Sequence, residues 1–218
     1  MALPFCATVT DPDYFMEPST GLLRVRARAV DQIVACGLPY CNVVRSLGLN
    51  DHDIFNNWYD QAQKLLAPTD IRSMFALTLL MGGEVQMVER PQISIAPTEV
   101  MEHFEQWAIR NLGSFKSENQ TGGISQINDG IGKSTHFGYL AEEICRNRSF
   151  FVTRRGFMGL GSLSIAPLAS VVLIHGLKTP FVVQRNPDKD LFRGECYIHG
   201  WMDAKLGLSE EDIYLNLV

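Results

Sequence analysis

The feature that most constrains the fold is a change of hydrophobic period at Ser149. From there to His199, apolar residues recur in short runs separated by turn residues: SFFVT, FMGLG, SVVLIHG, TPFVVQR and LFRGECYIHG. A period of two places successive side chains on opposite faces of a strand. The segments 154–156 and 176–178 contain glycines that suit hairpin turns, because glycine adopts a left-handed backbone at little cost. Residues 149–205 are therefore predicted to form an antiparallel meander of about five short strands.

A second alternating run lies near the N-terminus. In LLRVRARAVDQIVAC, residues 22–36, the basic residues Arg24, Arg26 and Arg28 alternate with apolar ones. This pattern predicts a half-buried strand with a basic outer face. We expect a solvated face that discourages edge pairing, with an anion contact as the alternative. The shared period predicts that residues 22–36 add strands to the sheet of residues 149–205.

The residues between these strands, 48–147, carry helical patterns. A first helix is predicted to run to about residue 67, with Asn50 or Asp51 as its cap. Two more are predicted at 70–81 and, behind a Thr98 cap, up to residue 112. The polar, glycine-rich stretch 113–134 is predicted to be a mobile loop. A short helix is expected after it, with Phe137 on its apolar stripe.

The last segment, residues 208–217, begins with Ser209 and three acidic residues. Acidic side chains favour the first turn of a helix, so a C-terminal helical turn is predicted here. The whole chain, residues 1–218, is then predicted to form a single α+β domain. In it, a helical part packs on a small antiparallel β-sheet or barrel.

Charge and composition limit the classes of partner. The net charge of −5 and the pI of about 5.5 argue against a nucleic-acid binder, which usually has a basic domain. The N-terminus lacks the basic start and apolar run of a signal peptide. The apolar run 162–174 is too short to span a bilayer and is broken by Pro167. The 5 cysteines are scattered, so we expect reduced thiols and a cytoplasmic protein with no membrane association.

The stretch GECYIHGWMD, residues 194–203, holds the pair of residues most suggestive of catalysis. A nucleophilic Cys196 would need His199 within hydrogen-bonding reach as its base. In an extended strand these two side chains lie on opposite faces, and Cys196 shares its face with Ile198. We therefore expect Cys196 to be a small buried residue, predict no catalytic residue, and do not expect an enzyme.

The opposite face of the same strand carries Glu195, Tyr197 and His199, with Asp203 beyond Gly200. These groups form a candidate polar face that could bind a polar group or perform acid–base chemistry. The alternative is a hydrogen-bonded network that is purely structural. A small hydrolase or ligand-binding protein that uses this face therefore stays open as a second function.

Cofactor and metal signatures are weak. Cys36 and Cys41 have a loose ligand spacing, but no second Cys or His pair follows at zinc-like intervals. The glycine-rich run 156–161, GFMGLG, lacks the spacing and the following helix of a dinucleotide fingerprint. Its Gly159 and Gly161 are expected to permit close backbone approach or a bend in the sheet. No cofactor and no metal site are predicted.

Three blocks in this region carry a family resemblance: SFFVTRRGFMGLG, VVLIHGLKTPFVVQR and GECYIHGWMD. Their order and residues resemble the C-terminal region of fungal heterokaryon-incompatibility (HET) domain proteins. That region ends in Gly-Glu-Cys-Tyr-(Val/Ile)-His-Gly-x-Met-Asp. LLRVRARAVDQIV and ALTLLMGG resemble upstream segments of the same proteins. The sequence departs from the family at Ala27, at Ala169-Ser170 and at Ala204-Lys205, where a glycine, a Pro-Gly-Asp turn and Gly-Glu are usual.

The resemblance implies an accessory or regulatory module that acts through contacts with a protein partner in fungal self/non-self recognition. In the family, the HET domain itself resembles TIR domains and lies N-terminal to this region. Its Ser-x-Val-Trp-Gly and Cys-Ile-Asn-Gln segments do not occur in this sequence. The death-inducing activity of that domain, and any TIR-like NAD cleavage, are therefore not carried over. We expect a truncated relative that lacks the HET domain.

Overall fold

The computed structural model describes residues 11–66, 70–82, 95–116, 127–187, 189–202 and 211–218. The chain divides into two compact units. The sheet unit holds the residues up to Cys36 and those from Phe151 onward, and the helical unit spans Gly37–Phe150. The predicted α+β class is confirmed. Within the described ranges, no helix has both the length and the apolar character that crossing a membrane requires.

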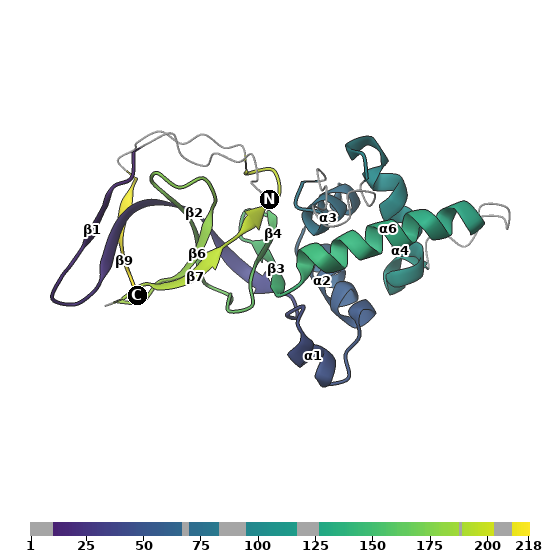
Figure 1. Cartoon of the computed structure of the whole chain (residues 1–218), viewed down its shortest axis with the longest axis horizontal. Coiled ribbons are helices and arrows are strands. Elements are labelled where there is room, and N and C mark those ends of the chain that lie inside the picture. The colour runs from purple at the N-terminus through teal and green to yellow at the C-terminus, as the bar shows by residue number, and fades with distance from the viewer. Residues whose placement is uncertain (1–10, 67–69, 83–94, 117–126, 188, 203–210) are drawn as a thin grey trace. The chain divides into compact units, whose positions relative to one another are not determined.

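The long strand β2, Leu23–Cys36, organises the sheet unit (Figure 1). All of its neighbours run antiparallel to it. Along one edge it pairs with β1, Tyr14–Met16, and then with β5, Ser170–Ile174. Along the other edge it pairs with β9, Ile213–Leu217, and then with β3, Arg148–Thr153. The prediction that residues 22–36 join the C-terminal sheet is therefore confirmed.

The remaining strands complete a curved sheet in the order β7-β6-β5-β2-β3-β4-β8. Their bounds are β4 Met158–Ser162, β6 Phe181–Gln184, β7 Leu191–Glu195 and β8 Tyr197–Ile198. The predicted meander is present for β5, β6 and β7, but β2 lies between β3 and β5, so the strand order is not sequential. The two end strands, β7 and β8, are separated in the chain by Cys196 alone and do not pair with each other.

The alternation of buried and exposed residues in strand β2 is interrupted in the middle. Val25 and Ala27 are buried, Ala29 is exposed, and Ile33 is buried again. The pairing register with β5 shifts between Ala29 and Asp31, as a β-bulge requires. The extra residue lets one strand contribute to two apolar clusters. The first holds Val25, Ala27, Val172, Ile174, Val183, Leu215 and Leu217; the second holds Ile33, Phe151, Ile165, Ala169, Val171, Val182, Cys196 and Ile198.

The turns between strands follow the glycine pattern of the sequence. Gly156 has φ +86° and Gly176 has φ +82°, so both adopt the left-handed backbone expected for these hairpins. Gly159 allows close packing, because a Cβ atom there would lie 2.2 Å from the Phe151 ring and 2.4 Å from the Tyr197 carbonyl oxygen. The predicted role of this glycine in close backbone approach is therefore confirmed.

The helical unit contains the helices that the sequence predicted, with modified bounds. The predicted Thr98 cap is wrong: Thr98 lies within a 3-10 turn, and the helix after it has Glu99 at its N-cap without a side-chain capping hydrogen bond. Asn50 and Asp53 form a reciprocal capping box at the start of α2, which explains why this helix begins where the sequence indicated. The bounds are α1 Asn42–Ser46, α2 Asp51–Leu65, α3 Ile71–Leu79, a 3-10 turn η1 Pro97–Glu99, α4 Val100–Asn111, α5 Gly113–Lys116 and α6 Ile127–Cys145.

Aromatic side chains fill the interior of the helical unit. Trp58 stacks on Phe150 and meets Phe55 edge to face, while its indole nitrogen donates to the Leu38 carbonyl oxygen at 2.7 Å. Such ring pairs add to the hydrophobic gain of burial, and the donated hydrogen bond removes the cost of burying the indole N–H. The unit therefore has a core of its own, distinct in composition from the aliphatic clusters of the sheet unit.

Two further predictions about local structure were wrong. Residues 113–116 and 127–134 are helical rather than part of a mobile loop, and residues 117–126 lie outside the described residues. Phe115 is buried against Tyr59 and Phe104, and Phe137 packs on Trp107, so tertiary packing outweighs the low helix propensity of the glycines there.

The second wrong prediction concerns the C-terminus. Ile213–Leu217 is strand β9 and not a helical turn. Its ladder with β2 buries Leu215 and Leu217, and this burial outweighs the weak preference that acidic residues give to a helix start.

Candidate functional site

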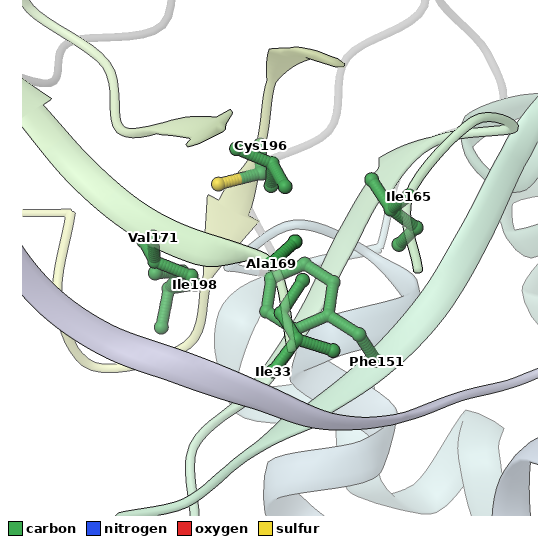
Figure 2. Close-up of a cluster of buried hydrophobic side chains, with 8 residues drawn as sticks. Ile33, Phe151, Ile165, Ala169, Val171, Cys196 and Ile198 are labelled. Carbon is green, nitrogen blue, oxygen red and sulfur yellow. The ribbon is translucent and has the colours of Figure 1, made fainter. Parts of the chain in front are cut away.

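The thiol of Cys196 lies in an apolar interior (Figure 2). The residue is 3% exposed and belongs to the cluster that contains Val171 and Ile198, to which β2 contributes Ile33. Its backbone N–H donates to the Pro180 carbonyl oxygen at 2.9 Å. The alternation of the strand thus places the thiol and Ile198 in the same cluster, as the sequence predicted.

The polar face of the same strand is partly assembled. Tyr197 is buried, and its hydroxyl lies 3.3 Å from Nδ1 of the half-buried His199. The backbone N–H of His199 donates to the Met158 carbonyl oxygen at 2.9 Å. Glu195 is exposed at the end of β7, where it opposes Phe181, and Asp203 lies outside the described residues. The structure brings Tyr197 and His199 together, and the binding or acid–base role of this face stays a prediction.

A charged cluster that the sequence did not predict lies around Asp212, next to β9. The Asp212 carboxylate lies 3.2 Å from a guanidinium nitrogen of Arg26, 2.9 Å from Nε of Arg28 and 3.0 Å from Nε2 of His175. The side chains of Asp212 and His175 are each 2% exposed. We call these four residues the Asp212 cluster. They come from three segments of the chain that only the folded sheet brings together.

This cluster corrects the interpretation of the basic strand. Arg26 and Arg28 do not form a solvated face; they are half-buried and paired with a carboxylate across the sheet. Arg24 differs from them, because it is exposed and stacks over the Tyr214 ring at 4.4 Å. A single carboxylate facing two guanidinium groups is electrostatically satisfied, which lowers the cost of burying these charges. The arrangement fastens β9 to β2 and to the end of β5.

The cysteines do not indicate a metal centre. Among the described residues, no group of three or more His, Cys, Asp or Glu side chains is placed to hold a metal ion. Cys36 and Cys41, the pair with loose ligand spacing, are both half-buried. Burial raises the pKa of Cys36 to about 11, so its thiolate is scarce near neutral pH.

An apolar hollow of about 400 Å³ opens on the sheet unit. We call it the β2–β9 hollow. Leu177, Phe192 and Val218 line it with exposed side chains. Val25 of β2 belongs to a buried cluster, and the partly buried Leu23 packs against that cluster. Hollows of this size at the mouth of a curved sheet are common binding places for apolar groups. Its lining is Gly21, Leu23, Val25, Ile174, Leu177, Phe192, Leu217 and Val218.

Comparison with known proteins bears on this geometry. No solved structure matches the chain. Heterokaryon incompatibility protein 6, OR allele, from Neurospora crassa is 37% identical over 71 residues, which cover 30% of this chain and 10% of that protein. The chain thus spans about a tenth of the length of this curated relative.

The family comparison covers more of the chain. Residues 98–218 match the family described as the Het-6 beta-barrel domain. These residues include α4, α6 and every strand from β3 to β9. The resemblance to heterokaryon-incompatibility proteins that the three sequence blocks predicted is therefore confirmed, and the chain belongs to the Het-6 beta-barrel domain family.

Proposed function

We propose that this chain is a non-catalytic accessory module of the Het-6 type that acts by binding other proteins. The β2–β9 hollow carries this proposal, because apolar side chains from four different strands and a turn line it on one surface. Exposed apolar patches of this kind are typical of protein interaction sites. An aromatic or aliphatic anchor from a partner would bury Phe192 and Leu177 and fill the hollow.

The chemistry-bearing side chains support the non-catalytic part of the proposal. The Cys196 thiol belongs to a cluster of aliphatic and aromatic side chains, whereas His199 contacts the Tyr197 hydroxyl. The carboxylate of Asp212 lies against two guanidinium groups, so its charge is compensated within the sheet. Both arrangements are typical of side chains that stabilise a fold, rather than of side chains that act in catalysis.

We place this action in the cytoplasm and in fungal self/non-self recognition. The matched Neurospora crassa protein is named for heterokaryon incompatibility, which motivates the biological setting. The described residues include no disulfide among the four cysteines Cys36, Cys41, Cys145 and Cys196, as is usual in a reducing compartment. The acidic net charge of −5 favours a protein partner over nucleic acid.

The test is quantitative co-purification from a filamentous fungus that expresses the tagged chain. Phe192→Asp places a charge in the β2–β9 hollow, and Leu168→Asp alters an exposed leucine outside its lining as a matched control. We expect Phe192→Asp to lose specific proteins that the wild type and the control both retain. Identical protein sets from all three chains, with each variant folded, would refute a role for the hollow.

A further inference from the structure

Strand β1 is an edge strand with three large exposed apolar side chains. Tyr14, Phe15 and Met16 are 69%, 61% and 60% exposed. Within the described residues β1 pairs with β2 alone, and Figure 1 shows it at the margin of the sheet unit. Edge strands usually carry charges, prolines or bulges that prevent further pairing. The central residues of β1 carry none of these, so the strand is suited to pair with another segment.

The register shows which backbone groups of β1 point outward. The Asp13 carbonyl oxygen accepts from the Arg26 N–H, and the Glu17 N–H donates to the Leu22 carbonyl oxygen, both at 2.9 Å. Hydrogen-bonded and non-hydrogen-bonded pairs alternate in an antiparallel ladder. The N–H and C=O groups of Tyr14 and Met16 therefore point away from β2, toward the outer edge.

Both faces of β1 are apolar at its centre. Tyr14 and Met16 lie opposite Val25 and Leu23, so they extend the apolar face that leads to the β2–β9 hollow. Phe15 lies on the other face, opposite Arg24. A segment added at this edge would thus find apolar neighbours on both faces.

The charges around β1 distinguish between possible occupants. Asp13 and Glu17 flank the apolar triplet on the face of Phe15. If a second copy paired antiparallel about Phe15, Asp13 of each copy would lie opposite Glu17 of the other. Like charges directly opposite each other destabilise a sheet, whereas basic residues at these two positions stabilise it. The charge pattern therefore favours a partner with cationic flanks over self-association.

We propose that the outer edge of β1 binds an extended segment of a protein partner by strand addition. The segment has three consecutive apolar residues with a lysine or arginine on each side. It pairs antiparallel, so that its first and third apolar residues exchange hydrogen bonds with Met16 and Tyr14. This inference rests on the proposed protein-binding function and names the kind of partner segment.

The test uses a fluorescent capped peptide with the core Lys-Val-Phe-Val-Lys, titrated onto the full chain by anisotropy. We expect saturable binding that weakens as salt is added, and at least about tenfold weaker binding of Glu-Val-Phe-Val-Glu. N-methylation of both valines should abolish binding, because their N–H groups face β1. N-methylation of the phenylalanine should be tolerated, because its N–H faces away. Equal loss with both N-methylated peptides would overturn the proposed register.

A protein variant provides an independent check. Met16→Pro removes an outward N–H and leaves the ladder with β2 intact, so the peptide should bind at least about tenfold more weakly to the folded variant. Phe192→Asp should leave peptide binding unchanged. Absence of peptide binding, with Phe192-dependent partners still captured, would refute strand addition and leave the protein-binding function standing. Dimerisation that Met16→Pro abolishes, seen by analytical ultracentrifugation, would refute the heterologous partner in favour of a second copy.

Discussion

The segment around β8 and the segment around β9 differ in how their ionisable side chains are used. Near β8, Cys196 and His199 are close in sequence, yet strand alternation sends them to different surroundings. Near β9, Asp212 meets Arg28, which is 184 residues away in the chain, at 2.9 Å. Local strand alternation thus predicted the apolar surroundings of Cys196, whereas the charged cluster around Asp212 depends on the ladder register and was indicated by no local pattern.

This difference has an energetic consequence. The Cys196 side chain contributes apolar packing, so its loss should cost little more than its burial. The Asp212 carboxylate compensates the charge of two guanidinium groups, so its removal leaves buried charge without a counterion. The comparison therefore predicts a ranked series of stability changes, measured as the free energy of unfolding in denaturant titrations.

The largest expected effect follows removal of the Asp212 carboxylate. Asp212→Ala should destabilise the protein by about 3 kcal/mol, the lower end of the range for breaking a buried ion pair, because the guanidinium groups retain some access to water. Asp13→Ala is the matched control, since Asp13 is half-exposed and 3.9 Å from Arg26; it should cost under about 1 kcal/mol. Similar costs for the two substitutions would remove the distinction between the two segments.

A second substitution tests the close packing around β8. Gly159→Ala would place a Cβ atom 2.4 Å from the Tyr197 carbonyl oxygen, so the strand must shift, at a cost of about 2 kcal/mol. Gly132→Ala in α6 is the control, because a Cβ there meets nothing within 4 Å. It should stabilise by about 0.5–1 kcal/mol through its higher helix propensity. A neutral Gly159→Ala would show that β4 and β8 are not in contact at this point.

A smaller effect is expected at the thiol itself. Cys196→Ser buries a hydroxyl group among apolar side chains, which should cost about 1–2 kcal/mol. Cys41→Ser is the control at a half-buried position and should change stability by less than about 0.5 kcal/mol. If Cys196→Ser proved as mild as the control, the thiol would have to lie in a polar environment.

The smallest effect concerns the candidate polar face. Tyr197→Phe removes the hydroxyl beside His199 and should cost about 1 kcal/mol if the contact is structural. Tyr214→Phe, which removes an exposed hydroxyl and keeps the ring, should cost under about 0.5 kcal/mol. Unchanged stability after Tyr197→Phe would favour the alternative in which this face is a functional site.

Local signals predicted a large part of the fold. The Asn50 capping box, the hairpin glycines and the short apolar runs SFFVT and SVVLI each specify their structure within a few residues of sequence. The alternation of side chains along a strand predicted that Cys196 and Ile198 share an apolar environment. These features depend on short-range chemistry, which is why they can be read from the sequence.

The features that could not be predicted depend on pairing between distant segments. Ile213, Leu215 and Leu217 alternate with more polar residues, but the preceding acidic residues indicated a helix start more strongly than this short alternation indicated a strand. The insertion of β2 between β3 and β5, and hence the Asp212 cluster, requires knowledge of strand order. In α6, burial of Phe137 against α4 outweighs a composition that is typical of a loop.

The most direct test of the central claim is alkylation of the native protein with iodoacetamide at about pH 8, where an accessible thiol of ordinary pKa reacts. Modification of each cysteine is followed over time by mass spectrometry. Because Cys196 is enclosed by apolar side chains, we predict that it stays unmodified while Cys41 reacts, and that it reacts fully once the protein is unfolded. Rapid modification of Cys196 in the folded chain, at the rate of Cys41 or faster, would contradict the account and restore this cysteine as a candidate nucleophile.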